Sequence, residues 1–213
     1  MAGPLTTGLA DVLSGARIMP VLTVPDPATA ARLADALVAG GALCAEVTFR
    51  TPGAEQALKA MAAHGGLTVG AGTVLTPLQA ERAVQAGARF VVSPGFDAEV
   101  VDRCRELGVP VVPGVATATE LMCALRAGLD TVKLFPAEPL GGTGMLRSLA
   151  APFPDARFVP TGGIGLARLP DYLAHPAVLA VGGSWMATIA HLERGDYDEV
   201  RRLTAEAVER STR

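Results

Sequence analysis

One unit recurs along most of the chain, and it restricts the available folds more than any other feature of the sequence. Each unit is a short apolar, often β-branched run, then a loop, then an Ala- and Leu-rich segment with helical spacing. Eight such runs occur, and their starts lie 26, 24, 22, 19, 22, 26 and 21 residues apart. The runs expected to be strands are 18–24, 44–49, 68–74, 90–95, 109–115, 131–137, 157–163 and 178–184.

The segments between these runs are expected to be helices. Several have a plausible cap, such as Thr117 with Glu120 three residues later, and several end at glycine. The expected helices are 29–39, 54–63, 77–86, 98–107, 118–127 and 144–150, with one more near 5–13 and another near 197–210.

Strands that are apolar on both faces are typical of a parallel sheet covered by helices. Eight units at a spacing of about 23 residues match a (β/α)8 TIM barrel in number and size. A doubly wound open sheet, the alternative, usually has about five or six strands. We therefore predict an α/β fold, namely one (β/α)8 barrel domain over residues 1–213 with an N-terminal helix before the first strand.

Composition excludes several classes of function. With 18 basic and 21 acidic residues, the net charge of −3 offers no general attraction for nucleic acid. The mean hydropathy is +0.36, and the stretches 60–80 and 172–192 carry no charge, but both contain too many Gly, Pro and His residues for a membrane-spanning helix. No basic residue precedes the first apolar segment, so a secretory signal is not expected. We expect neither a nucleic-acid partner nor a membrane.

The cysteines and histidines indicate the compartment and argue against metal. The three cysteines include no C-x-x-C pair, and no two histidines are four residues apart. This pattern fits neither a disulfide framework nor a zinc site. We expect a cytoplasmic protein without a bound metal.

Charged residues interrupt strands that should be apolar. Glu46 lies in the second expected strand with the same parity as Arg50 just beyond it, and Lys133 lies in the sixth. Residues of one parity point into a barrel, and catalytic groups of this fold lie at the carboxyl ends of its strands. A buried ion network that holds the barrel together is one interpretation. Because several strands converge on one barrel mouth, we favour a catalytic site.

Lysine usage supports a chemical role for Lys133. The chain has 16 Arg but only two Lys, and the other, Lys59, lies on the solvated face of an expected helix. Unlike arginine, lysine can lose its proton, and burial beside a cation such as Arg50 would lower its pKa. A neutral amine can attack a ketone and form a Schiff base. Glu46 is placed to move protons; burial would raise the pKa of Glu46 and nearby cations would lower it.

Glycine-rich segments end the seventh and eighth expected strands, as TGGIG at 161–165 and GGS at 182–184. In this fold a phosphate site is common at that position, and glycine lets backbone N–H groups approach the ligand. Ser184 adds a hydroxyl group. Strand-to-helix turns favour glycine in any case, but two such segments on adjacent strands favour a phosphate site.

Six motifs then resemble one known family. They are E-V-T-x-R (46–50), GAGTVL (70–75), SPG (93–95), K-x-F-P-A-E (133–138), PTGGI (160–164) and GGSW (182–185). In this order, over nearly the whole chain, they resemble the 2-keto-3-deoxy-6-phosphogluconate (KDPG) aldolases of the Entner–Doudoroff pathway. The resemblance implies a (β/α)8 barrel, a homotrimer, and class I chemistry through a Schiff base with no cofactor and no metal.

The resemblance also implies roles for residues around the expected amine. Lys133 would form the Schiff base, and Glu46 would be the general acid and base. Arg50 and Thr73 would hold the pyruvate carboxylate, and Phe135 would pack beside the imine.

The remaining motifs imply a site for the other half of the substrate. Gly162, Gly163 and Ser184 would bind its phosphate, and Thr161 would contact its sugar hydroxyls. The substrate would be a phosphorylated 2-keto-3-deoxy sugar acid. Its cleavage would give pyruvate and D-glyceraldehyde 3-phosphate. Many members of the family also cleave 4-hydroxy-2-oxoglutarate to pyruvate and glyoxylate.

Three alternatives share parts of this pattern. An aldolase for the galactonate analogue tends to have an apolar residue where this chain has Thr161. A phosphosugar isomerase or epimerase on the same barrel would use a pair of bases and no lysine imine. A barrel that only binds a phosphorylated sugar acid would need no catalytic lysine. Of these reaction classes, only an aldolase of the Schiff-base type predicts a covalent pyruvate adduct.

Overall fold

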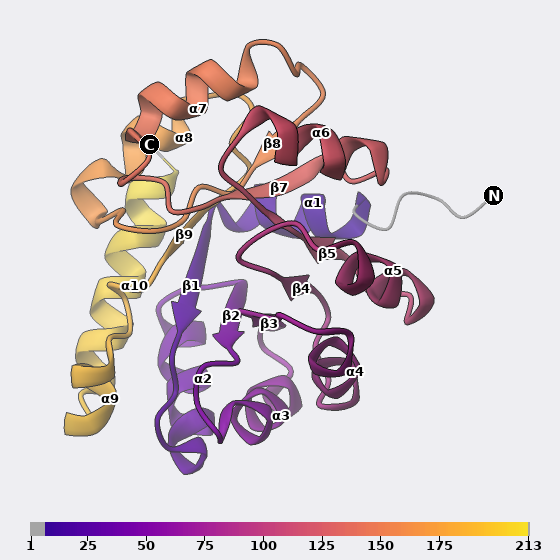
Figure 1. The fold of residues 1–213 in the computed structure, drawn as a ribbon. Coiled ribbons are helices and arrows are strands. Elements are labelled where there is room, and N and C mark those ends of the chain that lie inside the picture. The colour runs from indigo at the N-terminus through magenta and orange to yellow at the C-terminus, as the bar shows by residue number, and fades with distance from the viewer. Residues whose placement is uncertain (1–6, 213) are drawn as a thin grey trace.

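Nine short strands form two parallel sheets in residues 7–212, the part of the chain that the computed structural model describes (Figure 1). One sheet has the order β5-β4-β3-β2-β1-β9, and the other has the order β6-β7-β8. The strands are β1 (Ile18–Leu22), β2 (Cys44–Thr48), β3 (Thr68–Gly72), β4 (Val91–Val92), β5 (Val111–Val112), β6 (Gly114–Val115), β7 (Thr131–Leu134), β8 (Arg157–Phe158) and β9 (Val181–Gly183).

The two sheets border each other at both sides. β5 and β6 are separated by Pro113 alone, and a parallel bridge joins Thr161, just beyond β8, to Gly182 of β9. Strands that follow one another in sequence lie side by side, and β1 pairs with both β2 and β9. The expected α/β class with parallel strands is confirmed.

All eight expected strand positions contain a strand, but every strand is shorter than expected, and three of the runs keep only two-residue strands. The runs 90–95, 109–115 and 157–163 each contain a proline near the middle or end, at Pro94, Pro113 and Pro160. Proline has no N–H to donate to a strand ladder. The ladder accordingly stops at Val92, breaks between β5 and β6, and ends as a regular strand at Phe158.

Helices surround the strands (Figure 1). They are α1 (Thr7–Ala16), α2 (Ala30–Ala39), α3 (Ala54–His64), α4 (Pro77–Gln85), α5 (Ala98–Glu106), α6 (Ala118–Arg126), α7 (Gly142–Ala150), α8 (Leu169–Leu173), α9 (Ile189–Arg194) and α10 (Tyr197–Ser211), with 3-10 turns at Pro27–Thr29 and Leu166–Arg168. The capping box expected at Thr117 and Glu120 is confirmed.

Two features of the helices differ from expectation. The first helix extends to Ala16 rather than to residue 13, and Leu5 and Thr6 lie outside the described residues. Helices α8 and α9 were not expected, because each is only five or six residues long and carries too little periodic pattern.

The apolar core has two parts. The larger part fills the space between the strands and the surrounding helices. The smaller part lies inside the curve of the sheets, where Leu9 and Leu13 of α1 pack against inward-facing residues such as Met19, Phe90 and Val112. Helix α1 thus covers the amino ends of the strands. The carboxyl ends, where Lys133 and other buried polar residues lie, are left for a site.

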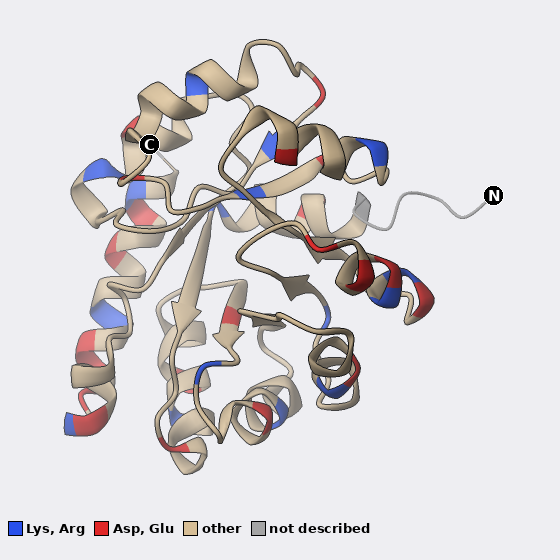
Figure 2. Cartoon of the chain, viewed as in Figure 1, with Lys and Arg blue, Asp and Glu red and all other residues tan. Residues whose placement is uncertain are grey.

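Charged residues lie mostly on the outer helices, with few on the strands (Figure 2). In residues 7–212, no helix is both long and apolar enough to cross a membrane. The same part of the chain contains no group of three or more His, Cys, Asp or Glu side chains arranged to hold a metal ion.

Candidate active site

A buried lysine and a buried glutamate meet inside the curve of the sheets. Lys133 extends from β7 and Glu46 from β2, and the Nζ atom lies 3.3 Å from Oε1 and 3.4 Å from Oε2 of the carboxylate. Lys133 is 3% exposed and Glu46 is fully buried. Burying either charge alone would be costly, so each supplies the other's counter-charge. The expected convergence of these two strands is therefore present.

Gly72 on β3 provides the space for the glutamate. In the parallel register, Glu46 lies beside Gly70 and Thr48 lies beside Gly72. A Cβ atom at Gly72 would overlap the Oε1 atom and the Cγ and Cδ atoms of Glu46. The sequence alone did not predict this role for the GAG segment at 70–72. Its signal was the spacing of two glycines at inward positions of one strand.

Phe135 forms an apolar wall next to the amine. The Nζ atom of Lys133 lies 5.1 Å from the centroid of the Phe135 ring, within the range of a cation–π contact. The same ring contacts the Cα region of Gly162, since a Cβ atom there would lie 3.2 Å from two ring carbons. Phe135 thus connects the Lys133–Glu46 pair with the glycine turn beyond β8.

Arg50 and Thr73 lie just beyond the carboxyl ends of β2 and β3. The Nε atom of Arg50 donates a hydrogen bond to Oγ1 of Thr73 at 3.2 Å. Thr73 has a φ of 56°, which is uncommon for a residue with a branched side chain and marks local strain. Among the described residues, the Glu46 carboxylate pairs with Lys133 and not with Arg50.

The glycine segments beyond β8 and β9 lie next to each other. Gly162 and Gly163 have φ values of 103° and 78°, which favour glycine. Thr161 forms the bridge to Gly182, where a Cβ atom would overlap its Oγ1 atom. Within residues 7–212, the backbone N–H groups of Gly162, Gly163 and Ser184 have no hydrogen-bond acceptor. These groups form a cluster of available donors.

The Trp185 ring explains why residue 183, in the glycine pair at 182–183, has no side chain. A Cβ atom at Gly183 would overlap the six-membered part of the Trp185 ring, so the ring packs directly on the backbone of β9. The ring is half-buried, as expected for a packing residue. Its Nε1 atom is buried and has no partner among the described residues.

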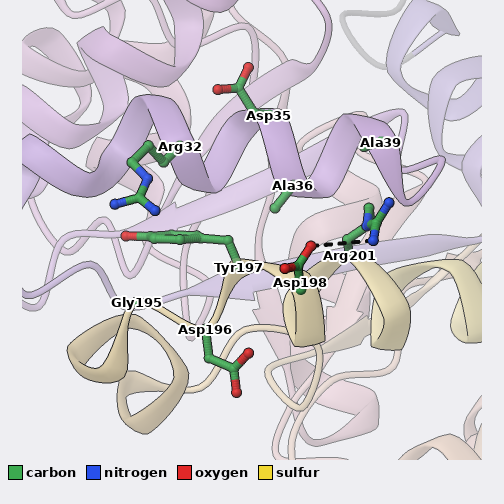
Figure 3. Close-up of a pocket in the computed structure, with 9 residues that line it drawn as sticks. All are labelled: Arg32, Asp35, Ala36, Ala39, Gly195, Asp196, Tyr197, Asp198 and Arg201. Carbon is green, nitrogen blue, oxygen red and sulfur yellow. Dashed lines mark hydrogen bonds and ion pairs between the residues drawn. The ribbon is translucent and has the colours of Figure 1, made fainter.

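A separate pocket of about 400 Å³ lies between α2 and α10 (Figure 3). Its polar groups are already paired: Arg32 stacks on Tyr197 at 4.4 Å from the ring centroid, and Arg201 pairs with Asp198 at 3.2 Å. It contains none of the residues that the sequence singled out. The Lys133–Glu46 pair with the glycine turns is therefore the candidate active site.

Comparisons with known proteins agree with this assignment. Residues 9–203 match the family model described as "Aldolase: KDPG and KHG aldolase". The 2-dehydro-3-deoxy-phosphogluconate aldolase of Treponema pallidum is 48% identical over 200 residues, covering 93% of this chain and 95% of the relative.

Two solved structures are similar in fold and sequence. The 2-keto-3-deoxy-6-phosphogluconate aldolase of Zymomonas mobilis ZM4, determined with 3-phosphoglycerate, has a TM-score of 0.90 and 42% identity, with 96% of each chain covered. The KDPG aldolase of Legionella pneumophila, with pyruvate captured as a covalent carbinolamine intermediate, has a TM-score of 0.90 and 37% identity. The match covers 93% of this chain and 97% of that one.

Proposed function

Because the chain belongs to the KDPG and KHG aldolase family and is thus a carbon–carbon lyase, we propose that its candidate site cleaves 2-dehydro-3-deoxy-6-phosphogluconate. The products are pyruvate and D-glyceraldehyde 3-phosphate. The observation that carries this proposal is the buried pair of Lys133 and Glu46, whose reacting atoms lie 3.3 Å apart. The family's name also includes 4-hydroxy-2-oxoglutarate (KHG) cleavage, and this substrate would use the same pair without a phosphate.

The reaction begins with transfer of the Lys133 proton to Glu46, which leaves a neutral amine beside a protonated acid. The amine attacks the C2 ketone and forms a carbinolamine; Glu46 then donates a proton to the leaving hydroxyl, and an iminium results. The carbinolamine that pyruvate forms in the Legionella pneumophila enzyme supports this first step.

The iminium accepts the electron pair of the C3–C4 bond. Glu46, ionised after donating its proton to the leaving hydroxyl, removes the proton from the C4 hydroxyl directly or through water; the C3–C4 bond breaks, and the aldehyde leaves with the phosphate. The remaining enamine is protonated at C3 by Glu46, directly or through water, and hydrolysis of the iminium releases pyruvate and restores Lys133. Atoms and charges balance without an added oxidant or reductant.

Other residues of the site bind and orient the substrate. Arg50 and Thr73 bind the pyruvate carboxylate, which places C2 next to the amine. Phe135 shields the imine from water. The hydrogen bond between Arg50 and Thr73, and the ring distance of 5.1 Å, support these assignments.

The phosphate binds to the N–H groups of Gly162 and Gly163 and to Ser184, and Thr161 contacts the sugar hydroxyls. The available donors in both glycine segments support this proposal. The polar side chain of Thr161 favours the gluconate over the galactonate substrate. An isomerase, an epimerase or a barrel that only binds the sugar acid would leave the Lys133–Glu46 pair without a chemical role.

We also propose that the two sheets are parts of one closed (β/α)8 barrel, and that residues 1–213 form a single domain. The short separation of β5 and β6 and the bridge from Thr161 to Gly182 support closure. From the family resemblance we propose a cytoplasmic homotrimer, and the exposed Leu75 and Leu78 side chains provide apolar surface for subunit contact. Light scattering of the purified protein would give its subunit number.

Trapping of the imine tests the proposed chemistry. We would incubate the protein with pyruvate, reduce it with borohydride and identify modified peptides by mass spectrometry. A reduced pyruvyl adduct on Lys133, absent without pyruvate, is expected. An adduct confined to Lys59, or no adduct on folded protein that still binds the phosphorylated acid, would overturn the proposal in favour of an isomerase or a binding protein.

A further inference from the structure

The K-x-F-P-A-E segment ends at Glu138, a residue for which the proposed chemistry has no role. Glu138 lies in the loop between β7 and α7 and contacts the turn beyond β8 through its backbone. Its N–H donates to the carbonyl oxygen of Gly162 at 3.0 Å. The side chain of Glu138 packs on Gly163, the residue after Gly162, since a Cβ atom at Gly163 would lie 2.9 Å from the Cβ atom of Glu138.

The carboxylate of Glu138 makes a second connection, to helix α8, which follows the glycine turn in the sequence. The hydroxyl group of Tyr172 on α8 donates a hydrogen bond to Oε1 of Glu138 at 2.5 Å. Tyr172 is fully buried, and its burial together with this hydrogen bond raises the pKa of its hydroxyl above the usual range. The hydroxyl therefore remains a donor across the physiological range. Glu138 thus holds both ends of the segment from Gly162 to Tyr172.

The surroundings of this contact are also adapted to it. The Nε atom of Arg168 lies 3.8 Å from Oε1 of Glu138, so a cation partly balances the carboxylate. Gly142, the first residue of α7, has a φ of 61°. A Cβ atom there would lie 3.2 Å from Oε1 of Glu138 and 3.3 Å from the Tyr172 hydroxyl oxygen. The absence of a side chain at Gly142 therefore leaves room for the contact.

We propose that Glu138 and Tyr172 are positioning residues that hold the Gly162–Gly163 turn in the conformation that receives the substrate's phosphate. This inference rests on the proposed function. Two consecutive glycines have wide backbone freedom, so their N–H groups would point in many directions without an external constraint. Fixing the turn before the substrate arrives removes this entropic cost from phosphate binding. Pyruvate carries no phosphate, so its imine formation at Lys133 makes no use of the N–H groups of the turn.

The test compares one phosphorylated and one unphosphorylated ligand. The variant Tyr172→Phe keeps the buried ring and loses only the hydroxyl. We expect the KM for 2-dehydro-3-deoxy-6-phosphogluconate to rise about tenfold, the effect of losing one hydrogen bond to a charged group. The pyruvate concentration that gives half-maximal borohydride trapping should stay within about twofold. Tyr197→Phe, at the other tyrosine of the chain, is the matched control and should change neither constant.

A double-mutant cycle separates this role from general loosening of the fold. Like Tyr172→Phe, Glu138→Ala should raise the KM for the phosphorylated acid. The KM of the double variant should be no higher than that of either single variant. Glu138→Gln retains an acceptor for Tyr172 and should restore most of the affinity. Three results would each overturn the inference: equal shifts in the KM for the phosphorylated acid and in the pyruvate concentration for half-maximal trapping, additive shifts of the KM in the double variant, or an unchanged KM.

The wild-type protein distinguishes failure of this inference from failure of the proposed function. If the wild type forms no pyruvate adduct and does not cleave the phosphorylated acid, the proposed function fails and the inference falls with it. If the wild type does both and Tyr172→Phe behaves like Tyr197→Phe, only the positioning role is wrong.

Discussion

The Nζ atom of Lys133 lies 3.3 and 3.4 Å from the two carboxylate oxygens of Glu46, although 87 residues separate them in sequence. Both side chains are almost completely removed from water. Transfer of one proton between them converts an ion pair into a neutral amine and a neutral acid. These are the two forms that imine formation and loss of water require. Their burial keeps solvent from competing for that proton.

Replacing Lys133 by arginine should abolish the chemistry while keeping the charge. Arginine is not deprotonated in proteins, so it can pair with Glu46 but cannot attack a carbonyl carbon. We expect Lys133→Arg to lose all pyruvate-dependent borohydride trapping and all cleavage. Circular dichroism should show folded protein. Lys59→Arg is the matched control and should trap pyruvate normally; cleavage by Lys133→Arg at a wild-type rate would contradict the assignment.

Replacing Glu46 by glutamine should slow proton transfer and leave the amine in place. The amide has nearly the same size and can still accept a hydrogen bond, but it cannot exchange the proton. General acid–base catalysis contributes about a hundredfold to ten-thousandfold, and kcat should fall within that range. The pyruvate concentration for half-maximal trapping should change little, although trapping will be slower. Normal turnover by this variant would remove Glu46 from the mechanism.

Replacing Gly72 by alanine should disturb Glu46 without removing any reacting group. The added Cβ atom would overlap the carboxylate, so Glu46 must move away from its present position near Lys133. We expect kcat to fall at least about tenfold, because a small misplacement of a reacting group is costly. Steady-state kinetics would measure this change.

Gly144→Ala provides the control for this substitution. Gly144 lies in α7 with nothing within 4 Å of an added Cβ atom. Alanine there should leave kcat unchanged and increase the free energy of unfolding by up to about 1 kcal/mol, since glycine is unfavourable within helices. If Gly72→Ala retains wild-type kcat, the glycine does not determine the position of Glu46.

Strand parity predicted the central pair, because Glu46 and Lys133 interrupt apolar runs at inward positions. Parity alone did not predict that the glycines of β3 leave space for the Glu46 carboxylate, since this depends on the register between Glu46 and these glycines. The contact between Glu138 and Tyr172 was also beyond prediction. It depends on the path of two loops and on α8, a helix of five residues without a recognisable period. Prolines likewise shortened strands whose apolar composition looked continuous.

Replacing Arg50 by lysine should weaken pyruvate binding more than it slows turnover. Lysine keeps the positive charge but loses the forked arrangement of donors that suits a carboxylate. It also loses the Nε donor that now reaches Thr73 at 3.2 Å. We expect the pyruvate concentration for half-maximal trapping to rise about tenfold, with a smaller change in the maximal trapping rate. If the pyruvate concentration for half-maximal trapping does not change, the pyruvate carboxylate does not bind to Arg50.

The three cysteines should differ sharply in reactivity. Burial, with a contribution from the nearby Glu46 carboxylate, raises the pKa of the Cys44 thiol to about 12, and burial raises that of Cys104 to about 12. A raised thiol pKa means less thiolate, so at pH 8 the Cys44 and Cys104 thiols are almost entirely protonated, whereas about a quarter of ordinary thiols are ionised. Cys123 on α6 is half-buried rather than buried.

A short treatment of native protein with iodoacetamide at pH 8, followed by peptide mass spectrometry, should therefore label Cys123 alone. Labelling of Cys44 and Cys104 should require denaturant, because the reagent needs both access and a thiolate. Cys123→Ser is the control and should remain unlabelled until the protein unfolds. Since Cys44 precedes Glu46 by two residues on β2, labelling of native Cys44 as fast as Cys123 would show that reagent and water reach the strand interior beside Glu46. That result would contradict the sealed environment from which the proton exchange between Glu46 and Lys133 was argued.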